Sequence, residues 1–276
     1  MSYADSVFIQ NCRHILKYGS WDTDQPVRPK WLDGAPAHTI RAFGIVNRYD
    51  LAKEFPVLTL RRTAFRNCID EILWIWQKKS NNTADLRSHI WDAWADENGS
   101  IGKAYGYQLG VKHCYPEGEF DQVDRILYDL RHNPTSRRIL ANLYTHADLH
   151  EMALYPCAYG MNFHVCDGKL SAVLNQRSAD MLTANNWNVV QYAVLLHMFA
   201  QASGLQPGEL LHVIADAHIY DRHVPIVEEL LEKQPLEAPA LWVDPSVDDF
   251  YAFTTDSFRM DSYRYHPLQT KIEVAV

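Results

Sequence analysis

Residues 158–177 read AYGMNFHVCDGKLSAVLNQR, two β-prone segments separated by Asp167-Gly168. Asp-Gly is a preferred two-residue loop of a β-hairpin, because both positions accept a positive φ. The stretch therefore predicts antiparallel strands at 158–166 and 169–177. Further strands are expected at 40–47, 138–144 and 209–217.

The hairpin also sets a register between its two strands. With a two-residue loop, Cys166 pairs with Lys169, and the same count places Cys157 opposite Ser178. A β-bulge would shift this pairing by one residue. In either case we expect the Cys157 thiol and the Arg177 guanidinium to be strand neighbours.

Helices are predicted where apolar residues recur every three or four positions. The segment 186–203 is apolar on almost every side, which indicates a buried helix. Asn185 or Asn186 is expected to cap its start, and Gly204 to end it. Amphipathic helices are expected at 64–77, 119–132 and 220–233.

Composition places limits on the class of protein. The chain has 276 residues, 47% hydrophobic and 22% charged, which is ordinary for a globular protein. No Pro/Gly/Ser-rich linker interrupts it, so we expect a single domain over 1–276. The stretch 20–38 is rich in Pro, Asp and Gly and is expected to be a long surface loop.

Charge and cysteine content limit the partners and the compartment. The net charge of −8 argues against broad binding to nucleic acid or to a membrane surface. No apolar run approaches the roughly 18 residues of a membrane helix. The five cysteines are widely spaced without a CxxC, which predicts free thiols, and no signal-peptide pattern opens the chain. These features predict a cytoplasmic protein.

Cys157 is a candidate nucleophile. Most cysteines in folded proteins are buried and inert, and that is the ordinary alternative here. A free thiol, with a pKa of about 8.5, is only slightly ionised at neutral pH. A neighbouring cation such as Arg177 favours the thiolate, so the predicted hairpin makes a reactive thiol more plausible.

Several arginines are candidates for binding a phosphate. A guanidinium donates two parallel hydrogen bonds, a geometry that matches phosphate oxygens. Arg137 and Arg138 follow the end of a predicted helix, and Arg28 lies in the long loop. Ser178 adds a hydroxyl beside Arg177. Taken alone, paired arginines are more often solvated surface residues.

Other polar residues lie at the margins of apolar elements. Glu71 lies at the edge of the apolar stripe of helix 64–77, and partial burial would raise its pKa toward values useful for proton transfer. An exposed Glu is the alternative. Asp216, His218 and Tyr220 alternate along a strand and therefore share one face. They would either bind a sugar hydroxyl or be core residues whose polar groups are hydrogen-bonded within the protein. No zinc-type cluster or phosphate-binding glycine loop is visible.

Short segments along the chain together resemble the thymidylate synthase family. The resemblance runs from about residue 4 to the end. In chain order the matching segments are 70–74 (DEILW), 90–99 (IWDAWADENG), 105–106 (YG), 136–138 (SRR), 154–157 (LYPC), 175–180 (NQRSAD), Asn188, 216–220 (DAHIY) and 274–276 (VAV).

The resemblance implies a fold, a reaction and an assembly. The fold would be α+β, a large twisted mixed sheet flanked by helices, with two sheets packed back to back in a homodimer. The reaction would be reductive methylation of dUMP to dTMP. The co-substrate 5,10-methylenetetrahydrofolate would supply the one-carbon unit and the hydride, leaving as dihydrofolate. No metal would be required.

The resemblance also implies roles for individual residues. Cys157 would add to carbon 6 of the uracil, Asn188 would read the base, and Glu71 and Tyr105 would assist proton transfers. Asp180 would belong both to the catalytic set and to the folate contacts. The nucleotide would be held by Arg28, Arg177, Ser178, His218 and Tyr220, with Arg137 and Arg138 from the partner subunit. The folate would contact Ile90, Trp91, Trp94, Leu154, Asp180, Ala184, Trp187 and Val276.

The sequence departs from the family pattern at three places near these residues, one of which is the loop 20–38, longer here than in many members of the family. Ala158 replaces the histidine that usually follows the nucleophile, and 184–187 (ANNW) replaces Gly-x-Pro-Phe. Two other functions remain open: a pyrimidine hydroxymethylase of the same fold, and a non-catalytic nucleotide- or RNA-binding relative. Trp91 and the C-terminal 274–276 favour methylation, because stacking the folate and excluding water favour hydride transfer.

Overall fold

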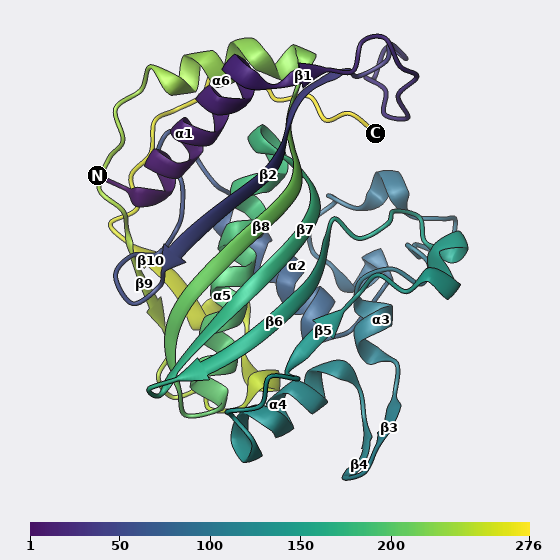
Figure 1. The fold of residues 1–276 in the computed structure, drawn as a ribbon, viewed down its shortest axis with the longest axis vertical. Coiled ribbons are helices and arrows are strands. Elements are labelled where there is room, and N and C mark those ends of the chain that lie inside the picture. The colour runs from purple at the N-terminus through teal and green to yellow at the C-terminus, as the bar shows by residue number, and fades with distance from the viewer.

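A six-stranded mixed sheet is the centre of the computed structural model, which describes residues 1–276 (Figure 1). The strand order is β1-β2-β8-β7-β6-β5, with β7 and β8 parallel and all other neighbours antiparallel. The expected α+β class with a mixed sheet is confirmed. Its strands are β1 (Ser20–Trp21), β2 (Thr39–Asp50), β5 (Leu140–Asn142), β6 (Ala158–Cys166), β7 (Lys169–Asp180) and β8 (Gln206–Tyr220).

Helices and two small hairpins complete the chain. The α-helices are α1 (Tyr3–Tyr18), α2 (Phe65–Trp76), α3 (Gly106–Gly110), α4 (Gln122–His132), α5 (Asn186–Ala202) and α6 (Val224–Leu231). A π-helical turn, Met181–Asn185, precedes α5. The 3-10 turns are Thr83–Asp85, Asp92–Trp94, His146–Glu151, Asp221–His223, Phe250–Ala252 and Thr255–Ser257. The small hairpins pair β3 (His113–Tyr115) with β4 (Gly118–Phe120), and β9 (Ala240–Val243) with β10 (Phe258–Asp261).

The helix predictions are confirmed, with three differences. The last predicted helix is shorter and begins at Val224, where Pro225 suits the first helical turn. Neither predicted asparagine caps α5: the Asn186 side chain instead bonds Leu58 N and Pro56 O. Helix α1 was not predicted, although Ser2 caps it in the usual way. Gly204 ends α5 with φ +70°, as expected.

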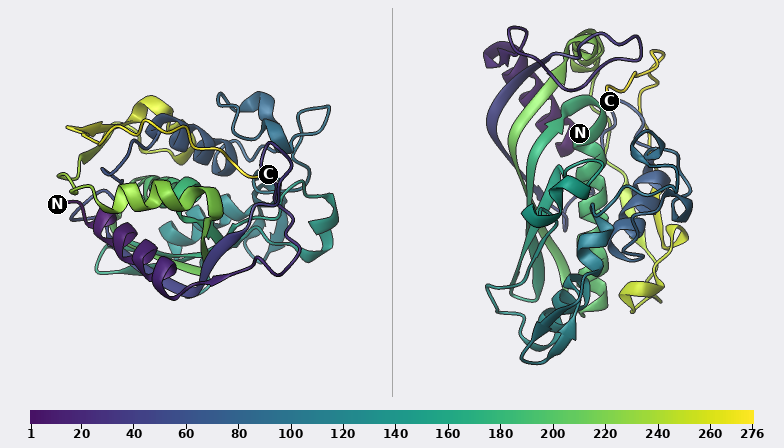
Figure 2. Two further views of the ribbon diagram at one scale, coloured as in Figure 1. Left: turned by 90° about the horizontal axis from the view of Figure 1, so that it is seen from above. Right: turned by 90° about the vertical axis from the view of Figure 1, so that its right-hand side faces the viewer.

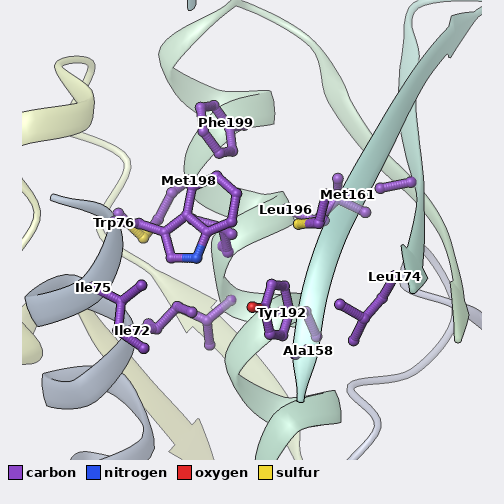
Figure 3. Packing of buried hydrophobic residues seen from close by; sticks show 14 of the residues in the cluster. Ile72, Ile75, Trp76, Ala158, Met161, Leu174, Tyr192, Leu196, Met198 and Phe199 are labelled. Carbon is purple, nitrogen blue, oxygen red and sulfur yellow. The ribbon is translucent and has the colours of Figure 1, made fainter. Parts of the chain in front are cut away.

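Helix α5 is buried between two layers. Figure 2 shows α5 against one face of the sheet, with α2 on its far side. Trp76 of α2 packs edge-on against Tyr192 and Phe199 of α5, while Met161 and Leu174 contribute from the sheet (Figure 3). Because both sides of α5 face apolar residues, its sequence is apolar all round.

The opposite face of the sheet carries no helix (Figure 2). On β2, Phe43 is 91% exposed and Val46 is 59% exposed. Val46 alternates with the buried Ile45 and Asn47, as expected along a strand, whereas Gly44, with φ +76°, interrupts the alternation between Phe43 and Ile45. The chain therefore has one sheet face that its own helices leave uncovered, with two exposed apolar side chains on β2.

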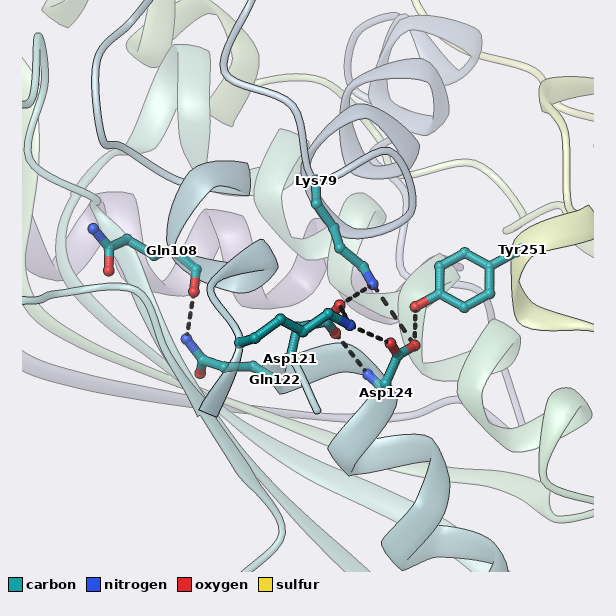
Figure 4. Close-up of polar contacts among 7 residues, drawn as sticks. Lys79, Gln108, Asp121, Gln122, Asp124 and Tyr251 are labelled. Atoms are coloured by element: carbon teal, nitrogen blue, oxygen red, sulfur yellow. Dashed lines mark hydrogen bonds and ion pairs between the residues drawn. The ribbon is translucent and has the colours of Figure 1, made fainter. Parts of the chain in front are cut away.

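A charged cluster joins three distant parts of the chain around the start of α4 (Figure 4). Asp121 caps α4 by accepting from Asp124 N, and it accepts a 2.6 Å bond from Lys79 Nζ beyond α2. Asp124 in turn accepts a hydrogen bond from Tyr251, in the C-terminal part. Asp121 is buried, so these pairs fix the helix start more firmly than surface pairs would.

Candidate active site

Cys157 and Arg177 lie side by side at the start of the central hairpin. The pairing of Cys166 with Lys169 is confirmed, but an irregularity between Ala158 and Gly160 shifts the register by one residue. Cys157 therefore lies opposite Arg177, not Ser178: the Arg177 N–H donates to Cys157 O at 2.9 Å. The Arg177 Nη2 group also lies 3.5 Å from the Cys157 Sγ.

Arg177 is locked in place by the chain that carries the thiol. Its Nε donates to Pro156 O at 3.0 Å and its Nη2 to Tyr155 O at 2.7 Å. Burial raises the pKa of the Cys157 thiol, and the charges of Arg177 and Arg28 lower it by less. The expected effect of the cation is present, but burial outweighs it, so the thiol is mostly protonated at neutral pH.

Tyr105 lies beside the same thiol. Its Oη accepts a 3.1 Å hydrogen bond from Cys157 N, so the phenol is in direct contact with Cys157. Tyr105 has φ +44°, an uncommon value for a residue with a side chain. Its ring packs edge-on against Trp91 at 5.2 Å. Burial raises the pKa of Tyr105, so its hydroxyl keeps its proton.

Glu71 is buried deeper than expected, at 7% exposed, and accepts three hydrogen bonds. Trp91 Nε1 donates to Oε1 at 2.6 Å, whereas Trp187 Nε1 and Gln191 Nε2 donate to Oε2 at 2.5 and 2.7 Å. Burial raises the pKa of Glu71, and the three donors offset part of that rise. The expected raised pKa is confirmed.

Asn188 is held by two glutamines. Its Oδ1 accepts from Gln176 Nε2 at 3.0 Å, and its Nδ2 donates to Gln191 Oε1 at 3.1 Å. Gln191 was not among the residues expected at the site. A buried glutamine in an otherwise apolar helix was the available signal, since such a side chain needs polar partners.

The predicted phosphate and sugar residues line one pocket of about 390 Å³. On its strand side, the His218 Nδ1 lies 3.0 Å from Asp216 Oδ1, and Tyr220 packs edge-on against His218. The predicted sharing of one strand face is therefore confirmed. The predicted residues that line the pocket are Arg28, Arg177, Ser178, Asp216, His218 and Tyr220.

Arg137 and Arg138 lie apart from this pocket. Both are exposed on the turn between α4 and β5, and neither forms an ion pair within 4.0 Å. Arg138 instead lines a separate hollow of about 790 Å³. Within one chain, these two guanidinium groups do not reach the pocket that contains Arg28 and Arg177.

An aromatic wall lies beside Glu71. The Trp91 and Trp94 rings meet edge-on at 5.6 Å, and Ile90 and Leu154 pack as half-buried side chains against the same core. Trp187 closes the wall through its bond to Glu71.

Asp180 begins the π-helical turn that contains Ala184 and leads to this wall. Its Oδ1 accepts from Leu182 N at 2.9 Å, and the buried His223 lies 3.7 Å from its Oδ2. Burial would raise the pKa of Asp180, but His223, His218 and Thr183 together outweigh it and the pKa is lowered.

The C-terminus folds back beside the loop at 20–38. Lys30 N donates to Val276 O at 2.8 Å, and Val276 N donates to Lys30 O at 3.0 Å. His223 contacts the same tail through Glu273 O at 2.8 Å. Val276 thus lies near Arg28 in the chain's long loop, while its own side chain is 37% exposed.

Comparison with known proteins gives one consistent result. The family model described as thymidylate synthase matches residues 6–276. The thymidylate synthase of Bacillus licheniformis is 43% identical over 281 residues, covering 100% of both chains. The chain belongs to the thymidylate synthase family.

Further comparisons agree with this family. Thymidylate synthase 1 of Bacillus subtilis is 42% identical over 281 residues, again covering 100% of both chains. A solved structure, thermostable thymidylate synthase A from Bacillus subtilis, matches with a TM-score of 0.95 at 40% identity and covers 100% of both chains. The large twisted sheet is thus the thymidylate synthase fold.

Membership confirms the enzymatic reading over the non-catalytic one. A thymidylate synthase is a methyltransferase that acts on carbon 5 of dUMP, and the relatives above favour this reaction over hydroxymethylation. No helix combines the length and the apolar character that crossing a bilayer requires. No group of three or more His, Cys, Asp or Glu side chains is arranged to hold a metal ion.

Proposed function

We propose that Cys157 is the nucleophile of a folate-dependent dUMP methylation carried out at the site described above. The observation that carries this proposal is the 3.5 Å approach of Arg177 Nη2 to the Cys157 Sγ, beside a pocket with two further phosphate-binding groups, Arg28 and Ser178. A thiolate that adds to carbon 6 of uracil makes carbon 5 nucleophilic. Arg177 stabilises that thiolate as the proton leaves.

Binding of the nucleotide places the base beside the Cys157 thiol. Arg28, Arg177 and Ser178 hold the phosphate, and His218 and Tyr220 bind the 3′-hydroxyl at the strand side of the pocket. The thiol is protonated at rest, and as the sulfur adds to carbon 6 its proton passes to water while the Arg177 guanidinium stabilises the anionic sulfur.

Asn188 reads the base, with Glu71 next to it. A carboxamide offers one acceptor and one donor, which match N3–H and O4 of uracil. Glu71, with its raised pKa, handles the proton at O4 through ordered water, and Tyr105 assists loss of the proton from carbon 5. Ala158, where relatives of this type usually have histidine, has no polar side-chain group that needs a partner in the site.

The aromatic wall fits a flat pteridine ring. Trp91, Trp94 and Trp187 present apolar ring faces, and Asp180 offers a carboxylate to ring N–H groups. The co-substrate 5,10-methylenetetrahydrofolate supplies the one-carbon unit and the hydride. The tail ending at Val276, with Ala184 on the facing turn, closes over the ring and excludes water. The other folate contacts are Ile90 and Leu154.

The protein acts as a single-domain homodimer in this proposal. The uncovered sheet face with Phe43 and Val46 exposed is suited to pack against a second copy. Arg137 and Arg138, free of ion pairs within their own chain, complete the phosphate site of the partner. Five free cysteines fit a cytoplasmic enzyme.

One assay tests the reaction. Purified protein is mixed with dUMP and 5,10-methylenetetrahydrofolate, and the absorbance of dihydrofolate is followed. Growth of the dihydrofolate signal together with dTMP supports the proposal. Release of tetrahydrofolate with 5-hydroxymethyl-dUMP would instead identify the hydroxymethylase.

A further inference from the structure

A continuous series of hydrogen bonds links five side chains beneath the site. His212 Nε2 lies 2.7 Å from Gln176 Oε1, and Gln176 Nε2 donates to Asn188 Oδ1 at 3.0 Å. Asn188 Nδ2 donates to Gln191 Oε1 at 3.1 Å, and Gln191 Nε2 donates to Glu71 Oε2 at 2.7 Å. The series joins the proposed base-reading amide to the buried carboxylate.

All four bonds run in one direction, from His212 to Glu71. An ionised carboxylate only accepts, so Gln191 must present its NH₂ to Glu71 and its carbonyl to Asn188. Asn188 then points its NH₂ to Gln191 and its carbonyl to Gln176. At the other end, burial lowers the pKa of His212 to about 3, so its ring is neutral, and because Gln176 presents its Oε1 the His212 Nε2 is the nitrogen that donates.

Gln191 cannot reverse its amide at low cost. Its side chain is 2% exposed, so no solvent replaces a lost partner. Its Nε2 also lies 3.4 Å from Cys68 O, and a reversed amide would place Oε1 against that carbonyl and against Glu71. A buried acceptor facing two acceptors loses its hydrogen bonds and gains repulsion.

We propose that Gln191 is a positioning residue that fixes the orientation of the Asn188 carboxamide and thereby the enzyme's preference for uracil over cytosine. This inference rests on the proposed base-reading role of Asn188. In the observed orientation, Asn188 keeps one N–H and one oxygen lone pair for the base, matching O4 and N3–H of uracil. The reversed amide would match cytosine, whose N3 accepts and whose exocyclic amine donates.

The same bond makes Gln191 one of the groups that hold Glu71. The titratable groups nearest to Glu71 are Asp70, Cys68, Tyr105 and Tyr192. None of these donates a hydrogen bond to the carboxylate: its donors are Trp91, Trp187 and Gln191. Losing the Gln191 donor therefore disfavours the ionised form of Glu71.

Three variants of the full chain separate these effects. Gln191→Met keeps the length of the side chain and removes both hydrogen bonds. Gln191→Glu keeps an acceptor for Asn188 but replaces the donor to Glu71 with an oxygen. Gln201→Met is the matched control, because Gln201 lies on the same helix and donates to Asp244 O and Val247 O, away from the site.

Two measurements are made on each variant: the ratio of the dCMP and dUMP dissociation constants by calorimetry, and the pH profile of kcat/KM with dUMP. Gln191→Met should reduce the preference for dUMP roughly five- to tenfold, the effect of one buried hydrogen bond, and shift the acidic limb to higher pH. Gln191→Glu should keep the preference within about twofold and shift the limb further. Gln201→Met should match wild type in both.

Thermal melts establish which variants are folded. If folded Gln191→Met matches Gln201→Met in both measurements, the inference is wrong. If Gln191→Met does not fold, a folded Gln191→Glu that loses its preference for dUMP also overturns it. A wild-type protein that fails to convert dUMP in the same assay would contradict the proposed function instead, so the two failures are distinguishable.

Discussion

The Cys157 sulfur is subject to two opposing influences. Burial raises its pKa, while Arg177 and Arg28 lower it, and the resting thiol is protonated. If Cys157 is the nucleophile, as proposed, its protonated thiol is protected from reaction with solvent species until the substrate binds. The adjacent Tyr105 hydroxyl is engaged with the backbone of Cys157, so it takes no proton from the thiol in the resting state.

Replacing Cys157 with serine should lower kcat by about 10³-fold or more, because a serine hydroxyl is a far weaker nucleophile at neutral pH. The dissociation constant for dUMP should change little, since the arginines and Asn188 are unaltered. Calorimetry and the dihydrofolate assay measure the two quantities. The control is Cys166→Ser, an exposed thiol on the same hairpin. Near-normal turnover in Cys157→Ser would remove the thiol from the mechanism.

The series of hydrogen bonds from His212 to Glu71 shows why some residues of the site were not predictable. Cys157, Arg177 and Glu71 are residue types whose charge or reactivity indicates function from the sequence alone. Gln191 and His212 carry neither, and their importance follows from being buried with a single possible set of partners. Only tertiary packing brings strand and helix side chains into one series.

At the scale of elements, the features that depend only on neighbouring residues were predicted correctly. The Asp-Gly turn gave the hairpin and its first pair, with φ +51° at Asp167 and +72° at Gly168. The irregularity after Ala158 was not predictable, because a bulge depends on how the strand meets its neighbours. Helix α1 has helical spacing at Phe8, Cys12 and Ile15, a signal that was present but not used.

Tyr105 owes its position to a close contact made by the next residue. A Cβ added at Gly106 would lie 2.2 Å from Ser80 O, a backbone atom with little freedom to move. Gly106→Ala should therefore cost about 1–3 kcal/mol of stability and lower kcat by displacing Tyr105. Gly160→Ala is the control, since the nearest atom to its Cβ would be Ala141 O at 3.5 Å, an ordinary van der Waals contact. Thermal melts in which both variants match wild type would contradict this prediction.

The C-terminal tail is tied to the site through His223. Burial lowers the pKa of His223, but the Asp180 carboxylate outweighs it and leaves the pKa raised above 6.5. A raised pKa means that the ion pair stabilises the fold fully below about pH 6.5 and is lost as pH rises through the folded value. Calorimetry from about pH 6 to about pH 9 should show Tm falling more for wild type than for His223→Gln. Parallel curves would rule out the coupling.

The whole molecule leaves two features unexplained within a single chain. One sheet face is uncovered and exposes Phe43 and Val46, and the arginine pair at 137 and 138 does not line the pocket that contains Arg28 and Arg177. The proposed homodimer would account for both, because in a twofold dimer each subunit contributes the same residues to its partner's site. Sequence reasoning reached this arrangement through family resemblance alone, since assembly leaves no local signature in the chain.

Mixing two inactive variants tests that exchange. Arg138→Ala is assayed at dUMP concentrations where it is weakly active, and Cys157→Ser is inactive throughout. In a mixed dimer, the chain with intact Cys157 would receive Arg138 from the Cys157→Ser chain, which restores one complete site. Dissociating and reassociating the two variants in equal amounts should recover up to roughly a quarter of wild-type activity, since half the dimers are mixed and each has one good site. If Arg138 served its own chain, no mixed dimer would contain a complete site, and activity would stay at the sum of the separate variants. Each variant reassociated with itself provides the baseline.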